Sequence, residues 1–165
     1  MATTARIGLM IPGSYAGAMP PPSAFGEFFQ SAEELGFDAL WVIDRIFHNL
    51  NILDPLTLLT HAAAATSRVR LGTAVLLLAF RNPVLVAKAA ATLDYLSGGR
   101  LTLGVSLGGR DYEFASQGIP ITQRVSRLRE NLAVMRKLGS EQHVTFHGRY
   151  YHLDQVNMEP KPVQK

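Results

Sequence analysis

The stretch Gly98-Gly99-Arg100-Leu101-Thr102-Leu103-Gly104-Val105-Ser106-Leu107-Gly108-Gly109 decides the fold of this chain. It begins with a glycine turn, continues as a short apolar strand and ends in a glycine pair. Large apolar residues alternate with Thr102, Gly104 and Ser106, so one face of the strand is bulky and the other is nearly bare. A flat ligand or another backbone can come close to the bare face. The same residues also fit an ordinary buried strand that is followed by a loop.

The composition is that of an ordinary globular protein with one sizeable core. Its 16 basic and 13 acidic residues are interspersed along 165 residues, so no basic stripe indicates nucleic-acid binding. The longest apolar run, residues 74–80, is too short to span a membrane, and the N-terminus lacks the pattern of a signal peptide. We therefore expect a cytoplasmic protein without nucleic-acid or membrane partners.

Cysteine is absent and the five histidines show no metal-ligand spacing. The sequence therefore predicts no disulfide, no thiolate nucleophile and no metal site.

Strands and helices are predicted to alternate along the chain. Three apolar segments of strand length precede the strand that starts at Leu101, at residues 6–11, 39–43 and 70–78. A helix is expected after each of the four strands, at residues 23–35, 56–66, 83–96 and 125–138.

The helix ends carry local signals. Asp54 and Asn82, each followed by proline, predict capped helix starts. Ser23 is the expected cap of the first helix, and Gly36 is the expected stop of that helix.

This βαβαβαβα order requires a parallel sheet, either open and doubly wound or part of an eight-stranded barrel. A complete (β/α)8 TIM-type barrel needs roughly 250 residues, so the chain holds about half of one. We expect a single domain over residues 1–165. Its four βα units fill residues 1–139, and a hairpin at 144–153 and a proline-broken tail fill residues 140–165.

Several landmarks occur in a specific order: ELGFDALWVIDR (34–45), SRVRLGTAV (67–75), NPVLVAKAAATLDYLSGGRLTLGVSLGG (82–109), EFASQG (113–118), RVSRLRENLAVMRKL (124–138), FHGRYYHL (146–153) and PKPVQ (160–164). Together they resemble the bacterial luciferase-like family of flavin- or deazaflavin-dependent oxidoreductases, which are (β/α)8 barrels. The resemblance runs from Arg6 to Gln164. In the family the last landmark lies just before the fifth strand, so the resemblance implies the N-terminal half of the barrel, without the late loops that hold the cofactor phosphate.

The resemblance implies FMN or coenzyme F420 as the cofactor. The positions that it assigns to cofactor binding are Ile11, Asp44, Ala74, Val75, Ser106, Leu107 and Gly108. Residues 73–75 match a bulge in the third strand, where several family members place a non-proline cis peptide behind the ring. Here that bond would be Ala74–Val75. The alternative is an ordinary trans strand.

The catalytic residues are unknown from the sequence, and Arg45 and His48 are weak candidates. Arg45 stands where many deazaflavin-using members carry histidine, and a guanidinium cannot exchange a proton as imidazole does. An ion pair with Asp44 or with another carboxylate is at least as good a role for Arg45, and His48 can simply be solvated. Gly109 replaces a glutamate that donates a proton in some dehydrogenases of the family. Both departures weaken a sugar-phosphate dehydrogenase interpretation.

Three hypotheses follow. The first is a luciferase-like oxidoreductase or monooxygenase that uses FMN or F420 on a small-molecule substrate. The second is a non-catalytic half-barrel that acts by self-association or by pairing with a second chain, since bare sheet edges favour a homo-oligomer such as a dimer. The third is a phosphosugar-type barrel or a doubly wound binding domain, which the absence of a G-x-G-x-x-G or P-loop pattern disfavours.

Overall fold

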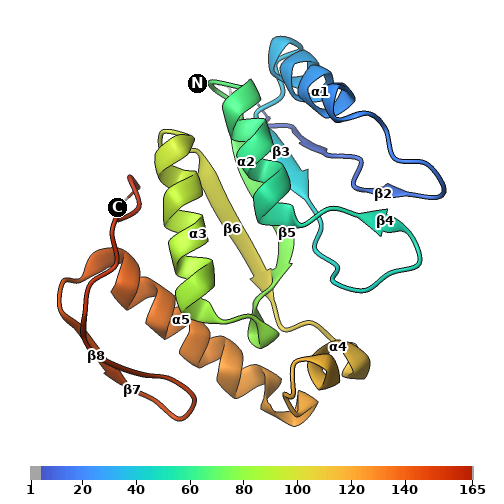
Figure 1. The fold of residues 1–165 in the computed structure, drawn as a ribbon. Coiled ribbons are helices and arrows are strands. Elements are labelled where there is room, and N and C mark those ends of the chain that lie inside the picture. Colours follow the sequence, from blue (N-terminus) through green and yellow to red (C-terminus); the bar gives the residue numbers. More distant parts are fainter. Residues whose placement is uncertain (1–4, 165) are drawn as a thin grey trace.

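The computed structural model describes residues 5–164 of the chain (Figure 1). The elements are, in order, β1 (Gly8–Met10), β2 (Ser14–Tyr15), α1 (Pro22–Glu34), β3 (Ala39–Val42), β4 (Asn51–Ile52), α2 (Pro55–Ala65), β5 (Arg70–Leu77), η1 (Leu78–Phe80), α3 (Pro83–Leu96), β6 (Leu101–Ser106), α4 (Asp111–Ser116), η2 (Ile121–Gln123), α5 (Arg124–Ser140), β7 (Val144–His147) and β8 (His152–Val156). No helix within residues 5–164 has the length and apolar character needed to cross a bilayer.

The central sheet is parallel, with the strand order β1-β3-β5-β6. Each of these strands is followed along the chain by one of the helices α1, α2, α3 and α5, and Figure 1 shows these helices on one side of the sheet. A doubly wound sheet would reverse its strand order and carry helices on both sides. The four predicted βα units and the half-barrel architecture are therefore confirmed.

The strand register divides the sheet into two faces. Leu40, Leu71 and Leu101 lie in register and are buried in the main core beneath the helices. The next residues along these strands, Trp41, Gly72 and Thr102, are also in register and point to the opposite side. We call this opposite side the inner face, because it would face the axis of a closed barrel.

Two of the three predicted helix caps are confirmed. The Asp54 side chain accepts a hydrogen bond from Thr57 N at 3.0 Å, and the Asn82 side chain accepts one from Val84 N at 2.9 Å. Ser23 is not a cap, since α1 already begins at Pro22 and its cap position makes no side-chain hydrogen bond. A proline in the first helical turn fixes the backbone angle that a helix needs, so this start requires no polar cap.

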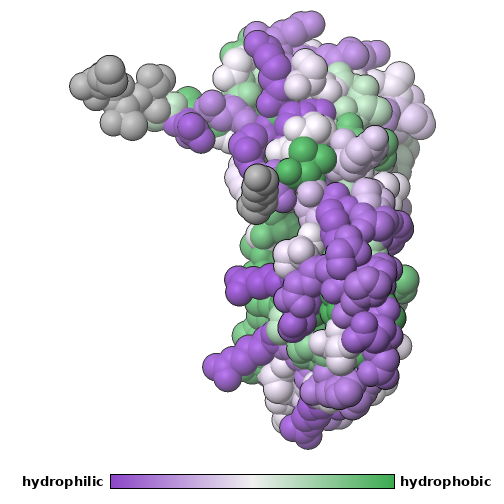
Figure 2. All heavy atoms as spheres, turned by 90° about the vertical axis from the view of Figure 1, so that its left-hand side faces the viewer, coloured by the Kyte–Doolittle hydropathy of each residue, from purple (hydrophilic) through white to green (hydrophobic). Residues whose placement is uncertain are grey.

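Helix α5 covers the end of the row of helices. It packs on α3 and η1, and it buries Val134 and Leu138. Val125, which the helical pattern placed on the buried face, is 45% exposed instead, because it lies in the first turn, before α5 reaches the core. The predicted hairpin is confirmed as the antiparallel pair β7–β8. Hydrophilic residues cover most of the surface on this side of the molecule (Figure 2).

Candidate active site

The third strand of the sheet contains the bulge that the sequence predicts. The register between β5 and β6 shifts between Thr73 and Leu76, and of the two alternatives for the Ala74–Val75 peptide bond, the structure has the cis form that the resemblance implies. At this bulge the Val75 side chain is 39% exposed, and Met10 on β1 is 47% exposed. The carboxyl-end half of the sheet therefore presents exposed apolar side chains.

Position 104 has no room for a side chain, because the neighbouring strand β5 comes close to it. A methyl group at Gly104 would overlap the carbonyl oxygen of Thr73, and Thr73 Oγ1 donates to the Gly104 carbonyl at 2.8 Å. The close approach that the bare strand face predicts is thus made, at this position, by the backbone of β5. Because Gly104 has no side chain, β5 and β6 can come this close at the bulge.

The residues that follow β6 form a tight turn at the carboxyl edge. Gly108 N donates to Ser106 Oγ at 3.4 Å, and the φ of Gly108 is +70°. A methyl group at Gly108 would lie 3.1 Å from a ring carbon of Phe80. Ser106, Leu107 and Gly108 are all partly exposed here.

Asp44 lies at the end of β3 and is only 4% exposed. Its carboxylate accepts from Leu77 N at 2.9 Å and from two nitrogens of Arg81, Nη2 at 2.7 Å and Nε at 3.2 Å. The proposed ion pair between Asp44 and Arg45 is therefore wrong, because Arg81 occupies both carboxylate oxygens. Asn131 Nδ2 donates to the carbonyls of Leu78 and Arg81, which fixes the same turn.

Arg81 was missed by sequence reasoning. The available signal was a cation within four residues of the end of the neighbouring strand, because the carboxyl ends of neighbouring parallel strands lie at one edge of the sheet.

The loops after β3 and β6 meet at this edge around a pocket of about 510 Å³. Its lining residues are Ile46, Phe47, His48, Asn49, Arg110 and Tyr112. The rings of Phe47 and Tyr112 have centroids 6.4 Å apart. Arg110 Nη1 donates to the Tyr112 hydroxyl at 2.7 Å, and this hydrogen bond raises the pKa of Arg110. His48 Nδ1 accepts from Leu50 N at 3.0 Å, so the other ring nitrogen of His48 is not used by that bond.

The structure brings most of the predicted cofactor residues together. Ala74 and Val75 lie on β5, and Ser106, Leu107 and Gly108 lie at the end of the adjacent β6. The Ile11 side chain is 1% exposed and packs in the main core, so this residue can reach a ligand only through its backbone. Residues 5–164 contain no group of three or more His, Cys, Asp or Glu side chains that is placed to hold a metal ion.

Known proteins share both the sequence and the fold. A curated relative, the F420-dependent glucose-6-phosphate dehydrogenase of Kineococcus radiotolerans, is 39% identical over 151 residues, which are 87% of this chain and 44% of the relative. The crystal structure of the monooxygenase RslO1 from Streptomyces bottropensis superposes with a TM-score of 0.89 at 29% identity, over 98% of this chain and 51% of that chain.

An F420-dependent secondary alcohol dehydrogenase in complex with an F420-acetone adduct superposes with a TM-score of 0.81 at 29% identity, over 97% of this chain and 50% of that chain. The chain thus spans about half the length of the proteins that it matches.

The sequence profile of the luciferase-like monooxygenases matches residues 4–165. This match covers nearly the whole chain. The chain therefore belongs to the luciferase-like monooxygenase family.

Proposed function

We propose that the protein is an oxidoreductase that binds a flavin or deazaflavin ring, FMN or F420, at the carboxyl ends of β5 and β6. The observation that carries this proposal is the exposed Val75 at the cis bulge, next to the small-residue face of β6. A planar ring gains binding energy from such an apolar surface, and the partly exposed backbone beside it can bind the polar edge of the ring. Relatives whose names state F420 dependence support the same cofactor class.

The residues of this chain would hold the ring and exclude water from it. Ala74 and Val75 would contact one face of the ring, and the Ser106 hydroxyl and the Gly108 backbone would bind its polar edge. The Asp44–Arg81 pair fixes the turn after β5, and so keeps the bulge in position. When bound, either cofactor supplies the hydride chemistry, and the protein provides binding and orientation.

The substrate would be a small molecule that enters between the loops after β3 and β6. Phe47 and Tyr112 offer apolar ring surface there, and Arg110 offers a positive charge. Arg45 directly precedes Ile46 but does not itself line this pocket, and it would bind an electron-rich group rather than transfer a proton. His48 lines the same pocket, and its imidazole offers a hydrogen-bonding group to the substrate.

Cofactor binding by the protein tests this proposal. FMN and F420 are titrated separately while the fluorescence of the cofactor is followed. Val75→Asp places a charge against the ring and should weaken binding by about tenfold or more. The matched control is Leu85→Asp, because Leu85 is 69% exposed on α3, on the helix side of the sheet. If neither cofactor binds, or if both variants bind equally well, the proposal is wrong.

A further inference from the structure

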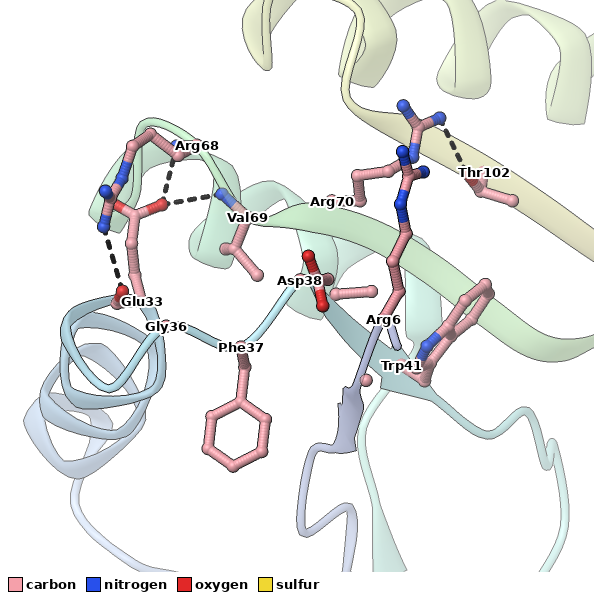
Figure 3. Close-up of a pocket in the computed structure, with 12 residues that line it drawn as sticks. Arg6, Glu33, Gly36, Phe37, Asp38, Trp41, Arg68, Val69, Arg70 and Thr102 are labelled. Atoms are coloured by element: carbon pink, nitrogen blue, oxygen red, sulfur yellow. Dashed lines mark hydrogen bonds between the residues drawn. The ribbon is translucent and has the colours of Figure 1, made fainter. Parts of the chain in front are cut away.

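A second pocket lies at the amino ends of the parallel strands, at the opposite edge of the sheet from the candidate active site (Figure 3). Its volume is about 660 Å³. Three arginines line it, Arg6, Arg68 and Arg70. None of its lining residues belongs to the candidate active site, so what it binds is independent of the proposed function.

The indole of Trp41 lines this pocket. Trp41 lies between Gly8 on β1 and Gly72 on β5, and a methyl group at either glycine would overlap the indole ring. The ring therefore extends across the neighbouring strands on the inner face. Trp41 is half-buried, so part of the indole remains open to the pocket.

The acidic residues of the pocket make no close ion pair with its arginines. Glu33 accepts hydrogen bonds from the three backbone N–H groups of residues 67–69, at 2.6 to 3.1 Å. Asp38 Oδ2 accepts from Ile7 N at 2.7 Å. Over residues 5–164, no carboxylate oxygen lies within 4.0 Å of a guanidinium nitrogen of the three arginines. The pocket therefore carries three arginines against two carboxylates, an excess of one positive charge.

The donors of the pocket lie on one side of it. Arg70 Nη2 donates to Thr102 Oγ1 at 3.0 Å and to Gln164 Oε1 at 3.3 Å, so the remaining N–H groups of Arg70 are available. Since Thr102 accepts this bond through its oxygen, its own hydrogen is free to donate elsewhere. In Figure 3 the side chains of Arg6 and Arg70 both extend to the Thr102 side of the pocket. Guanidinium groups together with a hydroxyl are a donor set that suits phosphate oxygens.

We propose that Arg6, Arg70 and Thr102 form a binding site for a phosphate group above the Trp41 indole. Phosphate has enough acceptor oxygens for two guanidinium groups and one hydroxyl at the same time. The volume of the pocket leaves room for free phosphate or for a small phosphorylated molecule.

Trp41 provides the test, because it is the single tryptophan of the chain and lies in this pocket. Inorganic phosphate is titrated into the chain against sodium chloride at constant ionic strength, while Trp41 fluorescence and its quenching by iodide are measured. Iodide should quench more strongly than neutral acrylamide, because the pocket concentrates anions. Phosphate should reduce the quenching by iodide, because it competes for the same guanidinium groups.

The variants are Arg6→Gln and Arg70→Gln, and the control is Arg136→Gln, which removes the same charge from the exposed surface of α5. Each pocket variant should weaken phosphate binding by about tenfold, and the control should leave it unchanged. Arg6 is exposed and makes no side-chain hydrogen bond within residues 5–164, so Arg6→Gln keeps the test valid even if Arg70→Gln fails to fold. The proposal is wrong if phosphate changes neither the fluorescence of Trp41 nor its quenching by iodide. It is also wrong if Arg6→Gln and Arg136→Gln bind phosphate equally well.

Discussion

The carboxylate of Asp44 and the guanidinium of Arg81 form a bidentate ion pair, with Nη2 to Oδ1 at 2.7 Å and Nε to Oδ2 at 3.2 Å. The Asp44 side chain has no exposed surface, and that of Arg81 is 19% exposed. The pair joins the end of β3 to the turn after β5. The carboxyl edge of the sheet, where we place the cofactor, therefore depends on a contact between residues 37 positions apart in the sequence.

Replacing Asp44 by asparagine should destabilise the protein strongly, because it removes the buried carboxylate that pairs with Arg81 and leaves only the more exposed Asp54, whose Oδ2 lies 3.6 Å from Arg81 Nη1. We expect a loss of about 3 kcal/mol in the free energy of unfolding, measured by urea denaturation. Asp154→Asn is the control, since Asp154 is 78% exposed in a pair with His147 and should change stability by less than about 0.5 kcal/mol. Equal losses in the two variants would contradict the role given to Asp44.

Glu33 should make stability depend on acidic pH. Burial alone would raise its pKa, but the hydrogen bonds from the backbone N–H groups of Val69, Ser67 and Arg68 and from the Ser67 hydroxyl outweigh burial and lower the pKa to about 2, from 4.5 in a free chain. Because the folded pKa is the lower one, this stabilisation is complete above pH 4.5 and is lost as the pH falls towards 2.

Glu33→Gln should therefore be less stable than the unmodified protein at neutral pH, and the difference should shrink between pH 4.5 and 2. Thermal unfolding at several pH values checks this expectation. Glu34→Gln is the control, since the neighbouring Glu34 is exposed at the end of the same helix. A difference between Glu33→Gln and the unmodified protein that does not change with pH would show that the carboxylate is not responsible.

Gly104 should not tolerate a side chain. In Gly104→Ala the added methyl group meets the carbonyl oxygen of Thr73, so β5 and β6 must separate at the bulge. We expect a loss of about 2 kcal/mol in the free energy of unfolding. Gly109→Ala, five residues further on, adds the same methyl group where no other atom lies within 4 Å, and it should be neutral. Equal stability of the two variants would show that the close approach is not required.

Replacing Arg100 by lysine should lower the stability of the protein. Its guanidinium donates to the carbonyls of Ser97, Val69, Ala63 and Thr66 and to the Thr66 hydroxyl, and so joins the end of α2 to the start of β5. Lysine has one nitrogen in place of three and cannot reach all these acceptors. Arg100→Lys should lose about 2 kcal/mol in denaturant unfolding. A stability equal to that of Arg136→Lys, a surface control, would contradict this expectation.

The fold could be predicted because its signals are local. Alternating apolar residues, proline-started helices and glycine stops each act over a few residues, and their order along the chain determines a parallel sheet. Ser23 and Val125 show the limit of such signals. Proline can start a helix without a polar cap, and a helical pattern does not reveal where a helix first meets the core. The β2–β4 pair was also missed, since two-residue strands carry no periodic pattern.

The candidate site could be predicted only in part. The sequence resemblance pointed to the bulge at Ala74–Val75. It did not show which residues contact one another in the site, because tertiary contacts determine this. The Asp44–Arg81 pair and the approach of Thr73 to Gly104 both join residues that are more than 30 positions apart. The amino-end pocket was missed for the same reason, because Arg6, Arg70 and Thr102 meet only through the strand register.

The central claim is that a planar redox coenzyme binds at the carboxyl ends of β5 and β6. Backbone amide chemical shifts of the isotope-labelled protein, recorded by NMR during titration with FMN or F420, test it most directly. We predict that the largest shift changes occur at Val75, Ser106 and Gly108. Changes confined to the amino-end pocket around Trp41 and Arg70, or no changes with either cofactor, would contradict the claim.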